Sequence, residues 1–146
     1  MDKRKIGYAV KTLARMIDKK IDAYVAELSG GELSGMKGWI LSYISVHEGE
    51  AVFQRDIEAA FYIKRPTATE FLQNLEESGY IRRVPVPYDA RLKKIELTEK
   101  AEAFNARLKK QIDVFEKKLR AGFDEKESED FVNYVARFIG NLGEKF

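Results

Sequence analysis

The sequence predicts a mainly α-helical protein of one domain that carries a single small β-hairpin. Apolar residues recur at steps of three and four over most of the chain, which is the period of an amphipathic helix. Residues 80–97 differ, because they form two short strand-like runs on either side of Pro85 and Pro87. With 146 residues and 45% hydrophobic content, the chain can bury one ordinary core or share a core in an oligomer.

The composition removes several classes of function. The formal net charge is only +2, so any basic surface for a polyanion must be local. The absence of cysteine removes disulfides, thiolate catalysis and cysteine-rich zinc sites. The basic start is not followed by a signal-peptide core, and no apolar run reaches the roughly 18 to 20 residues that span a bilayer. We therefore expect a cytoplasmic protein with no membrane contact and no cofactor.

The first two helices are predicted at residues 6–28 and, after Ser34-Gly35, at residues 36–46. The first carries one apolar stripe and ends at Ser29-Gly30-Gly31. The second is apolar around much of its circumference and ends near Gly49, so we expect it to be central and heavily buried.

The next two helices have the lengths and spacing of a helix-turn-helix. Residues 53–61 suit the positioning helix, residues 62–64 the turn, and Pro66 the first position of the following helix. In that helix Ala68, Leu72 and Leu75 share the face that should meet the core. Gly79 closes it, because glycine readily adopts the left-handed conformation.

A basic hairpin follows, with strands predicted at residues 80–84 and 92–97. Pro85 and Pro87 should keep its tip extended and outside the ladder. Five cations between residues 80 and 96 oppose only Asp89 and Glu96, a surplus of three positive charges. Such charges also occur on solvated hairpins, where they protect an edge strand from aggregation. Next to a helix-turn-helix, they favour nucleic-acid binding.

Two further helices complete the chain, the first from residue 99 up to an interruption at Gly122. Asp124 and Glu127 form a capping box at the start of the last helix. The three long apolar stripes exceed what one small domain needs to cover itself, so we expect a homodimer. Residues 1–34 and 99–146 would be its dimerisation helices, and residues 35–98 the DNA-binding lobe. A two-fold dimer would place two recognition helices on the order of 34 Å apart.

These residues resemble the MarR family of winged helix-turn-helix transcription regulators over nearly the whole chain. The most specific match is Asp89-Ala90-Arg91 with Leu97-Thr98, which is similar to the Asp-x-Arg signature of that family's wing and the Leu-Thr before its long helix. The end of the recognition helix and the start of the wing match as well, at Leu72, Leu75, Glu76, Gly79 and Ile81.

The resemblance implies roles for particular residues. Arg91 would reach the minor groove or its phosphates, with Asp89 holding the wing in shape. Thr67 and Thr69 would contact bases or phosphates from the recognition helix, and Arg65 a backbone phosphate. Glu70 departs from the family pattern, in which arginine is frequent, so this residue either reads a base or weakens binding. In full, the residues expected to contact DNA are Arg65, Thr67, Thr69, Glu70, Gln73, Asn74, Arg82, Arg83, Asp89, Arg91, Lys93 and Lys94.

A second candidate site is an effector pocket. Trp39, Tyr43 and His47 lie four residues apart on one helix and could line a pocket for an aromatic effector, while Arg15 could neutralise an acidic one. Ordinary core packing is the favoured interpretation, since aromatic residues at helical spacing are usually core. No metal site is expected, because His47 is the only histidine.

The sequence therefore predicts a homodimeric regulator of transcription that binds duplex DNA and acts as a ligand-responsive repressor. The alternative is a winged-helix dimer that serves as a ligand-sensing or protein-interaction module with weak DNA affinity, which Glu70, Glu76 and Glu77 would permit. We expect no enzyme, because there is no glycine-rich phosphate loop and no nucleophile with an obvious base.

Overall fold

The computed structural model describes residues 2–146, and over this range it has six helices and one two-stranded sheet. The predicted class, mainly helical with one hairpin, is confirmed. Contacts divide the chain into two units, the first running to Lys110 and the second comprising Gln111–Phe146. The elements are α1 (Ile6–Leu28), α2 (Gly35–Val46), α3 (Gln54–Phe61), α4 (Arg65–Glu77), β1 (Ile81–Val86), β2 (Asp89–Leu97), α5 (Glu99–Leu119) and α6 (Glu125–Asn141).

The core of the first unit forms around α2, as the sequence predicts. Ile40 and Leu41 are fully buried on α2, and Val25 of α1 is fully buried beside that helix. A Cβ added at Gly38 would lie 2.6 Å from Cγ2 of Val25, so glycine is what lets α1 and α2 approach so closely. Val46, by contrast, is 81% exposed, so the burial of α2 does not extend to its last turn.

The helix-turn-helix is formed by α3 and α4. The backbone N–H of Phe53 donates to Oδ2 of Asp56 at 2.8 Å, which fixes the start of α3. Tyr62, at φ 52°, adopts the left-handed conformation that ends α3. Pro66 is the second residue of α4 rather than the predicted first. Ala68, Leu72 and Leu75 are fully buried, so the predicted core face of this helix is confirmed.

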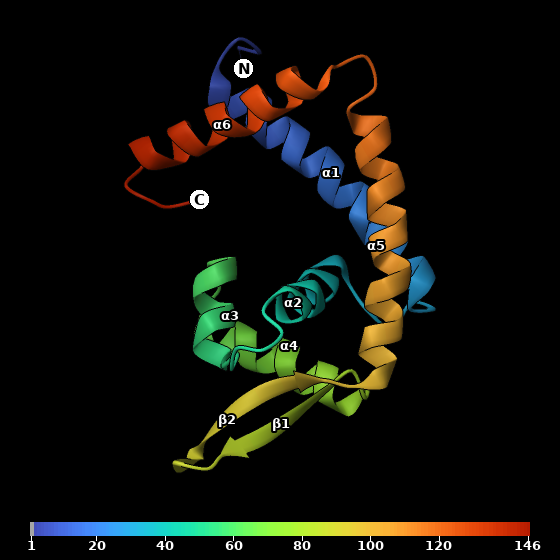
Figure 1. Cartoon of the computed structure of the whole chain (residues 1–146), viewed down its shortest axis with the longest axis vertical. Helices are drawn as coiled ribbons and strands as arrows, with labels where there is room; N and C mark the ends of the chain where they lie inside the picture. The colour runs from blue at the N-terminus through green and yellow to red at the C-terminus, as the bar shows by residue number, and fades with distance from the viewer. Residues whose placement is uncertain (1) are drawn as a thin grey trace. The chain divides into compact units, whose positions relative to one another are not determined.

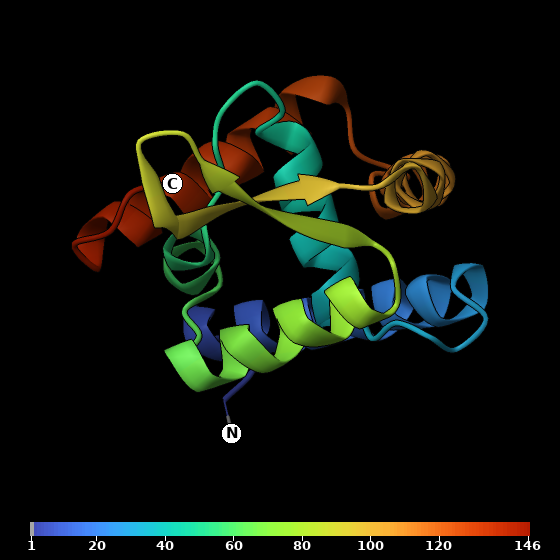
Figure 2. The ribbon, with the colours of Figure 1, turned by 90° about the horizontal axis from the view of Figure 1, so that it is seen from below.

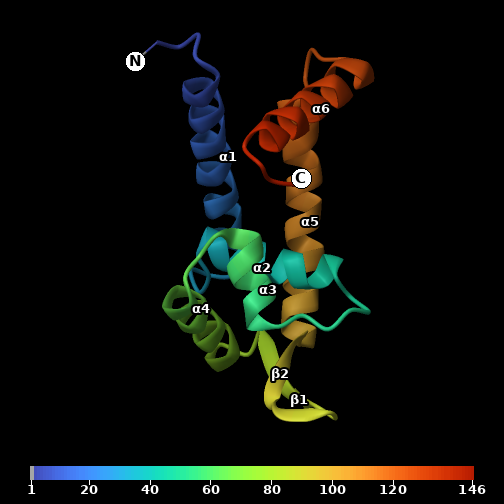
Figure 3. The ribbon, with the colours of Figure 1, turned by 90° about the vertical axis from the view of Figure 1, so that its left-hand side faces the viewer.

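The hairpin is longer than predicted. The prediction that the first strand ends at Val84 and that the prolines lie outside the ladder was wrong for Pro85, which pairs with Lys93. Both strands of a two-stranded sheet are edge strands, so the missing N–H of proline need not break a ladder bond. The register shifts directly after Pro85, between it and Val86. The hairpin extends beyond α2, α3 and α4 (Figures 1 and 3), and α4 lies beside it (Figure 2).

The base of the hairpin is tied to the helices by polar contacts around Tyr80. The Tyr80 hydroxyl donates to Oε2 of Glu32 at 2.8 Å, and Lys100 Nζ lies 3.1 Å from the same oxygen. Lys100 also lies over the Tyr80 ring, 4.4 Å from its centroid. Burial, followed by the hydrogen bond to Glu32, raises the pKa of Tyr80 to about 12. These contacts join the loop after α1, the start of β1 and the start of α5.

The second unit contains the end of α5 and all of α6. The predicted capping box is confirmed: Glu127 N–H donates to Asp124 Oδ1 at 2.7 Å, and Asp124 N–H donates to Glu127 Oε2 at 2.9 Å. No described residue of α6 is buried, and Phe131 is 51% exposed. No helix in the described part of the chain is long and apolar enough to cross a membrane.

Candidate nucleic-acid interface

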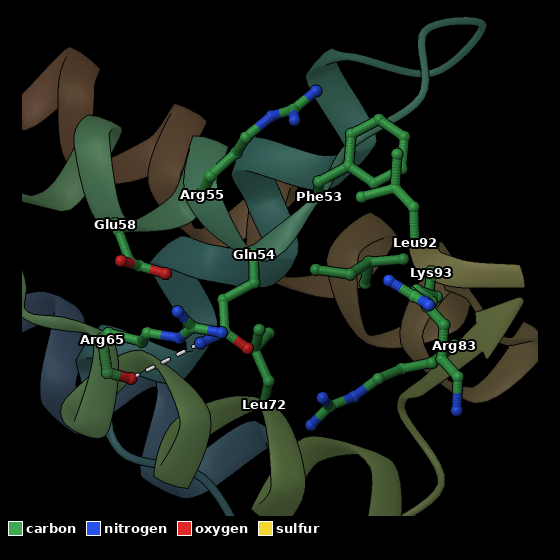
Figure 4. Close-up of a pocket in the computed structure, with 11 residues that line it drawn as sticks. Phe53, Gln54, Arg55, Glu58, Arg65, Leu72, Arg83, Leu92 and Lys93 are labelled. Carbon is green, nitrogen blue, oxygen red and sulfur yellow. Dashed lines mark hydrogen bonds between the residues drawn. The ribbon is translucent and has the colours of Figure 1, made fainter. Parts of the chain in front are cut away.

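A basic groove lies between the helix-turn-helix and the hairpin. Five cations and one carboxylate line it, which gives its charged side chains a net charge of +4. Gln54 and Arg65 stand on one side of it, and Arg83 and Lys93 on the other (Figure 4). A concave surface of one charge focuses the field on a polyanion. The charged lining residues are Arg55, Glu58, Arg65, Arg83, Arg91 and Lys93, with Phe53, Gln54, Leu72, Leu92 and Ile95 between them.

The first turn of α3 positions the first turns of α4. Nε2 of Gln54 donates to Thr69 Oγ1 at 2.8 Å and makes a longer contact of 3.4 Å to the carbonyl oxygen of Arg65. A backbone carbonyl only accepts, so the Gln54 amide must turn its nitrogen toward both oxygens. Thr69 therefore accepts from Gln54, and within residues 2–146 its own hydroxyl hydrogen has no acceptor.

Arg83 is held at the wall of the groove with part of its hydrogen-bonding capacity unused. Its Nε lies 3.7 Å from Oε2 of Glu76, which is an ion pair but too long for a hydrogen bond. That buried Nε has no acceptor within residues 2–146. An unpaired buried donor is costly, so this arrangement of Arg83 is unfavourable in the free chain.

The tip of the hairpin has the local structure that the sequence signature implies. Oδ1 of Asp89 accepts the backbone N–H of Arg91 at 2.9 Å, which shapes the turn at the start of β2. The Arg91 side chain lines the groove, and Tyr88 beside it is 75% exposed. Asp89 thus supports the backbone from which Arg91 extends.

The two faces of the hairpin divide its predicted DNA contacts. Arg83 pairs with Ile95, while Arg82 pairs with Glu96 and Val84 with Lys94, so Arg82 and Lys94 lie on the face opposite Arg83. Lys94 is bound to Glu96 at 2.9 Å and lines a different cavity. Arg82 and Lys94 are therefore outside the basic groove, and their contact with DNA stays a prediction.

The exposed face of α4 is polar and carries little positive charge. Thr67, Glu70 and Gln73 are exposed, and Asn74 is half-buried. Nδ2 of Asn74 donates back to the carbonyl oxygen of Glu70 at 2.9 Å, and Nε2 of Gln73 donates to Glu77 at 3.2 Å. The predicted recognition residues thus share one surface, beside the groove rather than in it.

Comparison with known proteins agrees with this geometry. The model of the MarR family matches residues 32–92, which include α2, α3, α4, β1 and the start of β2. A transcription regulator MarR from Oenococcus oeni PSU-1 is 26% identical, with 93% of this chain and 99% of that chain covered and a TM-score of 0.75. The chain is MarR-like over these residues.

Two structures of MepR from S. aureus show the same fold. One is a MepR–DNA complex, 22% identical, with a TM-score of 0.83 over 97% of this chain and 99% of that chain. The other is MepR in a DNA-binding conformation, 24% identical, with a TM-score of 0.82 over 94% of this chain and 98% of that chain. The predicted winged helix-turn-helix fold of this MarR-like protein is therefore confirmed.

Sequence reasoning missed three polar residues of the basic groove: Gln54, Arg55 and Glu58. All three lie on α3, which was read only as a positioning helix. The one available signal is that the first turn of a positioning helix lies close to the recognition helix, so polar side chains there are candidates for the interface.

The predicted effector residues are not gathered in one described cavity. Trp39 lines a cavity with Asp18, Asp22 and Met36, whereas His47 lines another near Glu48. The centroid of the Tyr43 ring lies 4.1 Å from that of His47 and 5.8 Å from that of Phe61. Burial raises the pKa of the Tyr43 hydroxyl, with smaller effects from the charges of Asp56 and Glu50. Arg15 is exposed on α1. No cluster of histidine and acidic residues that could hold a metal occurs among residues 2–146.

Proposed function

We propose that this protein regulates transcription by binding duplex DNA at a pseudo-palindromic site as a homodimer. The observation that carries the proposal is the basic groove, because its cations come from both halves of the motif: Arg55 and Arg65 from the helices, and Arg83, Arg91 and Lys93 from the hairpin. Phosphates that pass between helix and wing would meet a net charge of +4, and the release of their counterions would favour binding.

Docking would place α4 in the major groove and the wing along the backbone. Thr67, Thr69, Glu70, Gln73 and Asn74 would face base edges or nearby phosphates, because they lie opposite or beside the buried stripe of α4. Arg91 would extend from the wing toward the minor groove, where negative potential is concentrated. Arg82 and Lys94 would contact phosphates only from the opposite face of the hairpin.

The homodimer is supported by apolar side chains that remain exposed within each unit. On α1, Ile6 and Met16 are 54% and 64% exposed, and on α6, Phe131 and Phe138 are 51% and 42% exposed. Exposed apolar surface of this extent is unfavourable in water, and a second copy would bury it. The two recognition helices would then enter successive turns of the major groove on the same side of the DNA.

Repression that a small ligand relieves is the finer part of the proposal. The cavity lined by Trp39, Met36 and Leu33 offers an aromatic ligand apolar contacts. Asp18 and Asp22 line the same cavity, so an aromatic ligand without negative charge would fit it better than an acidic one.

A second function, a protein-interaction or ligand-sensing module with weak DNA affinity, is favoured by one observation. Helix α4 carries three glutamates against a single arginine, so the recognition helix itself is acidic. If this function holds, the purified protein will bind genomic DNA weakly and without preference among fragments.

Selection of genomic DNA fragments by the purified protein tests the proposal. We expect a pseudo-palindromic sequence to be enriched, and its affinity to fall by roughly tenfold in both Arg91→Ala and Thr67→Ala. Lys20→Ala is the control, since it removes one exposed positive charge of α1, outside the groove. Wild-type affinity in both site variants would rule out this docking mode, and no enrichment over background would favour the interaction module.

A further inference from the structure

The recognition helix carries three carboxylates, and the structure treats them differently. Glu76 forms an ion pair with Arg83, at 3.7 Å, and Glu77 accepts a hydrogen bond from Gln73 at 3.2 Å. The carboxylate of Glu70 has neither an ion pair nor a hydrogen bond within the described residues 2–146. Among residues 2–146, Glu70 is thus the one carboxylate of α4 with neither a hydrogen-bond donor nor an ion-pair partner.

The side chains that would be expected to compensate Glu70 are engaged elsewhere. On a helix, the neighbours of residue 70 in the C-terminal direction are Gln73 and Asn74. Nε2 of Gln73 donates to Glu77, and Nδ2 of Asn74 donates to the backbone carbonyl oxygen of Glu70 rather than to its carboxylate. The Glu77 carboxylate and the Glu70 carbonyl oxygen cannot donate a hydrogen bond, so each amide must turn its nitrogen toward its acceptor.

Glu70 also lies where a base edge would be met. It follows the fully buried Ala68 by two residues, which places it about 200° around the helix axis, on the face opposite the core. Its exposed side chain stands next to Thr69, whose hydroxyl accepts from Gln54. Neither Thr69 nor Glu70 lines the groove that holds the cations, so phosphate binding in the groove does not require Glu70.

A carboxylate in this position has two possible effects on DNA binding. It repels phosphates at any sequence, or it accepts a hydrogen bond from a base amino group at a particular sequence. Only the amino groups of cytosine and adenine donate into the major groove. Adenine presents its N7 acceptor beside that amino group, which repels a carboxylate, whereas cytosine presents no acceptor of its own there.

We propose that Glu70 is a specificity-determining residue that accepts a hydrogen bond from the N4 amino group of a cytosine in each half-site. This inference rests on the proposed function, because it assumes that α4 enters the major groove. Thr69, with its hydroxyl hydrogen left to donate, contacts an acceptor on an adjacent base or phosphate. Glu70 thereby contributes selectivity, while the groove contributes charge.

The test compares the DNA sequences selected by the wild type, Glu70→Gln and Glu77→Gln from one random duplex library. Both variants remove one negative charge from the same face of α4, and both replaced residues are exposed. In Glu70→Gln we expect the cytosine preference at one position of each half-site to fall by about 5-fold or more and to move toward adenine, which glutamine binds through N6 and N7. Glu77→Gln should keep the wild-type preference.

The remaining outcomes separate this inference from the proposed function. If the wild type enriches a sequence and Glu70→Gln keeps the same preference while binding all sequences more tightly, Glu70 only repels phosphates and the inference is wrong. A change of preference in Glu77→Gln equal to that in Glu70→Gln would also overturn it. If the wild type enriches no sequence, the proposed function fails first, and the inference fails with it.

Discussion

The recognition helix and the wing differ in how they are charged. The hairpin contributes three cations to the basic groove, Arg83, Arg91 and Lys93. Helix α4 contributes one cation, Arg65, and carries three glutamates. A wing that supplies phosphate affinity leaves the helix free to carry side chains whose value depends on the base sequence. In the proposed function, affinity and selectivity would therefore come from separate parts of one motif.

The two regions also differ in how they are anchored. Three side chains of α4 are fully buried, so the helix is part of the core of the first unit. The hairpin is held at its base, where Val52 pairs with Ile95 and Tyr80 binds Glu32, and Val86 at the far end of β1 is also buried. Its turn extends beyond the helices (Figure 3), and Tyr88 there is 75% exposed. A helix that reads bases needs a fixed position, while a wing that follows the backbone does not.

The largest effect is expected from the anchor of the helix. Leu72→Ala should lower the free energy of unfolding by about 2–5 kcal/mol, because it leaves a cavity under α4. Tyr88→Ala, at the exposed wing tip, should change it by no more than about 0.5 kcal/mol. Urea unfolding followed by circular dichroism measures both. Equal losses in the two variants would contradict the difference in anchoring.

The sequence predicted the helices well, because their apolar periodicity and end signals are local. Ala68, Leu72 and Leu75 were placed on the core face by spacing alone, and the Asp124 capping box follows from two residues three apart. The ladder at Pro85 could not be predicted this way. Whether proline is tolerated depends on whether the strand is at an edge, which the local sequence does not state.

The site was predictable where a motif is contiguous and not where it is assembled by folding. Asp89 and Arg91 are two residues apart, and the wing signature implied that Asp89 holds the wing in shape, although not that it accepts the Arg91 N–H. Gln54 and Thr69 are fifteen residues apart and meet only because α3 crosses α4. Arg82 and Arg83 look alike in sequence, yet strand alternation places one of them outside the groove.

An intermediate effect is expected from the charge of the wing. The double substitution Arg91→Ala and Lys93→Ala should weaken binding to all DNA sequences alike. It should also reduce the slope of log affinity against log salt by about 4 for the homodimer, because each of the two protomers loses two phosphate contacts at close to 0.9 each. Gln73→Ala, on the exposed face of α4, should leave that slope unchanged. Titrations at several salt concentrations, with the selected sequence and a scrambled one, measure both. A changed base preference in the wing variant would show that the two roles are not separate.

The smallest effect concerns Tyr80, where the end of the recognition helix meets the wing. Its pKa is raised to about 12, so the folded protein keeps this hydroxyl protonated in a range where the unfolded chain, with an ordinary value near 10, loses the proton. The stabilisation is therefore complete below pH 10 and declines as the pH rises from 10 toward 12.

Tyr80→Phe removes both that titration and the hydrogen bond to Glu32. It should cost about 1 kcal/mol at pH 8, and its stability should fall less steeply than that of the wild type between pH 10 and 11. Lysines and the other tyrosines titrate in both proteins, so the difference between the two pH profiles of the melting temperature isolates Tyr80. Parallel profiles would show that its hydroxyl does not hold the wing to the loop after α1.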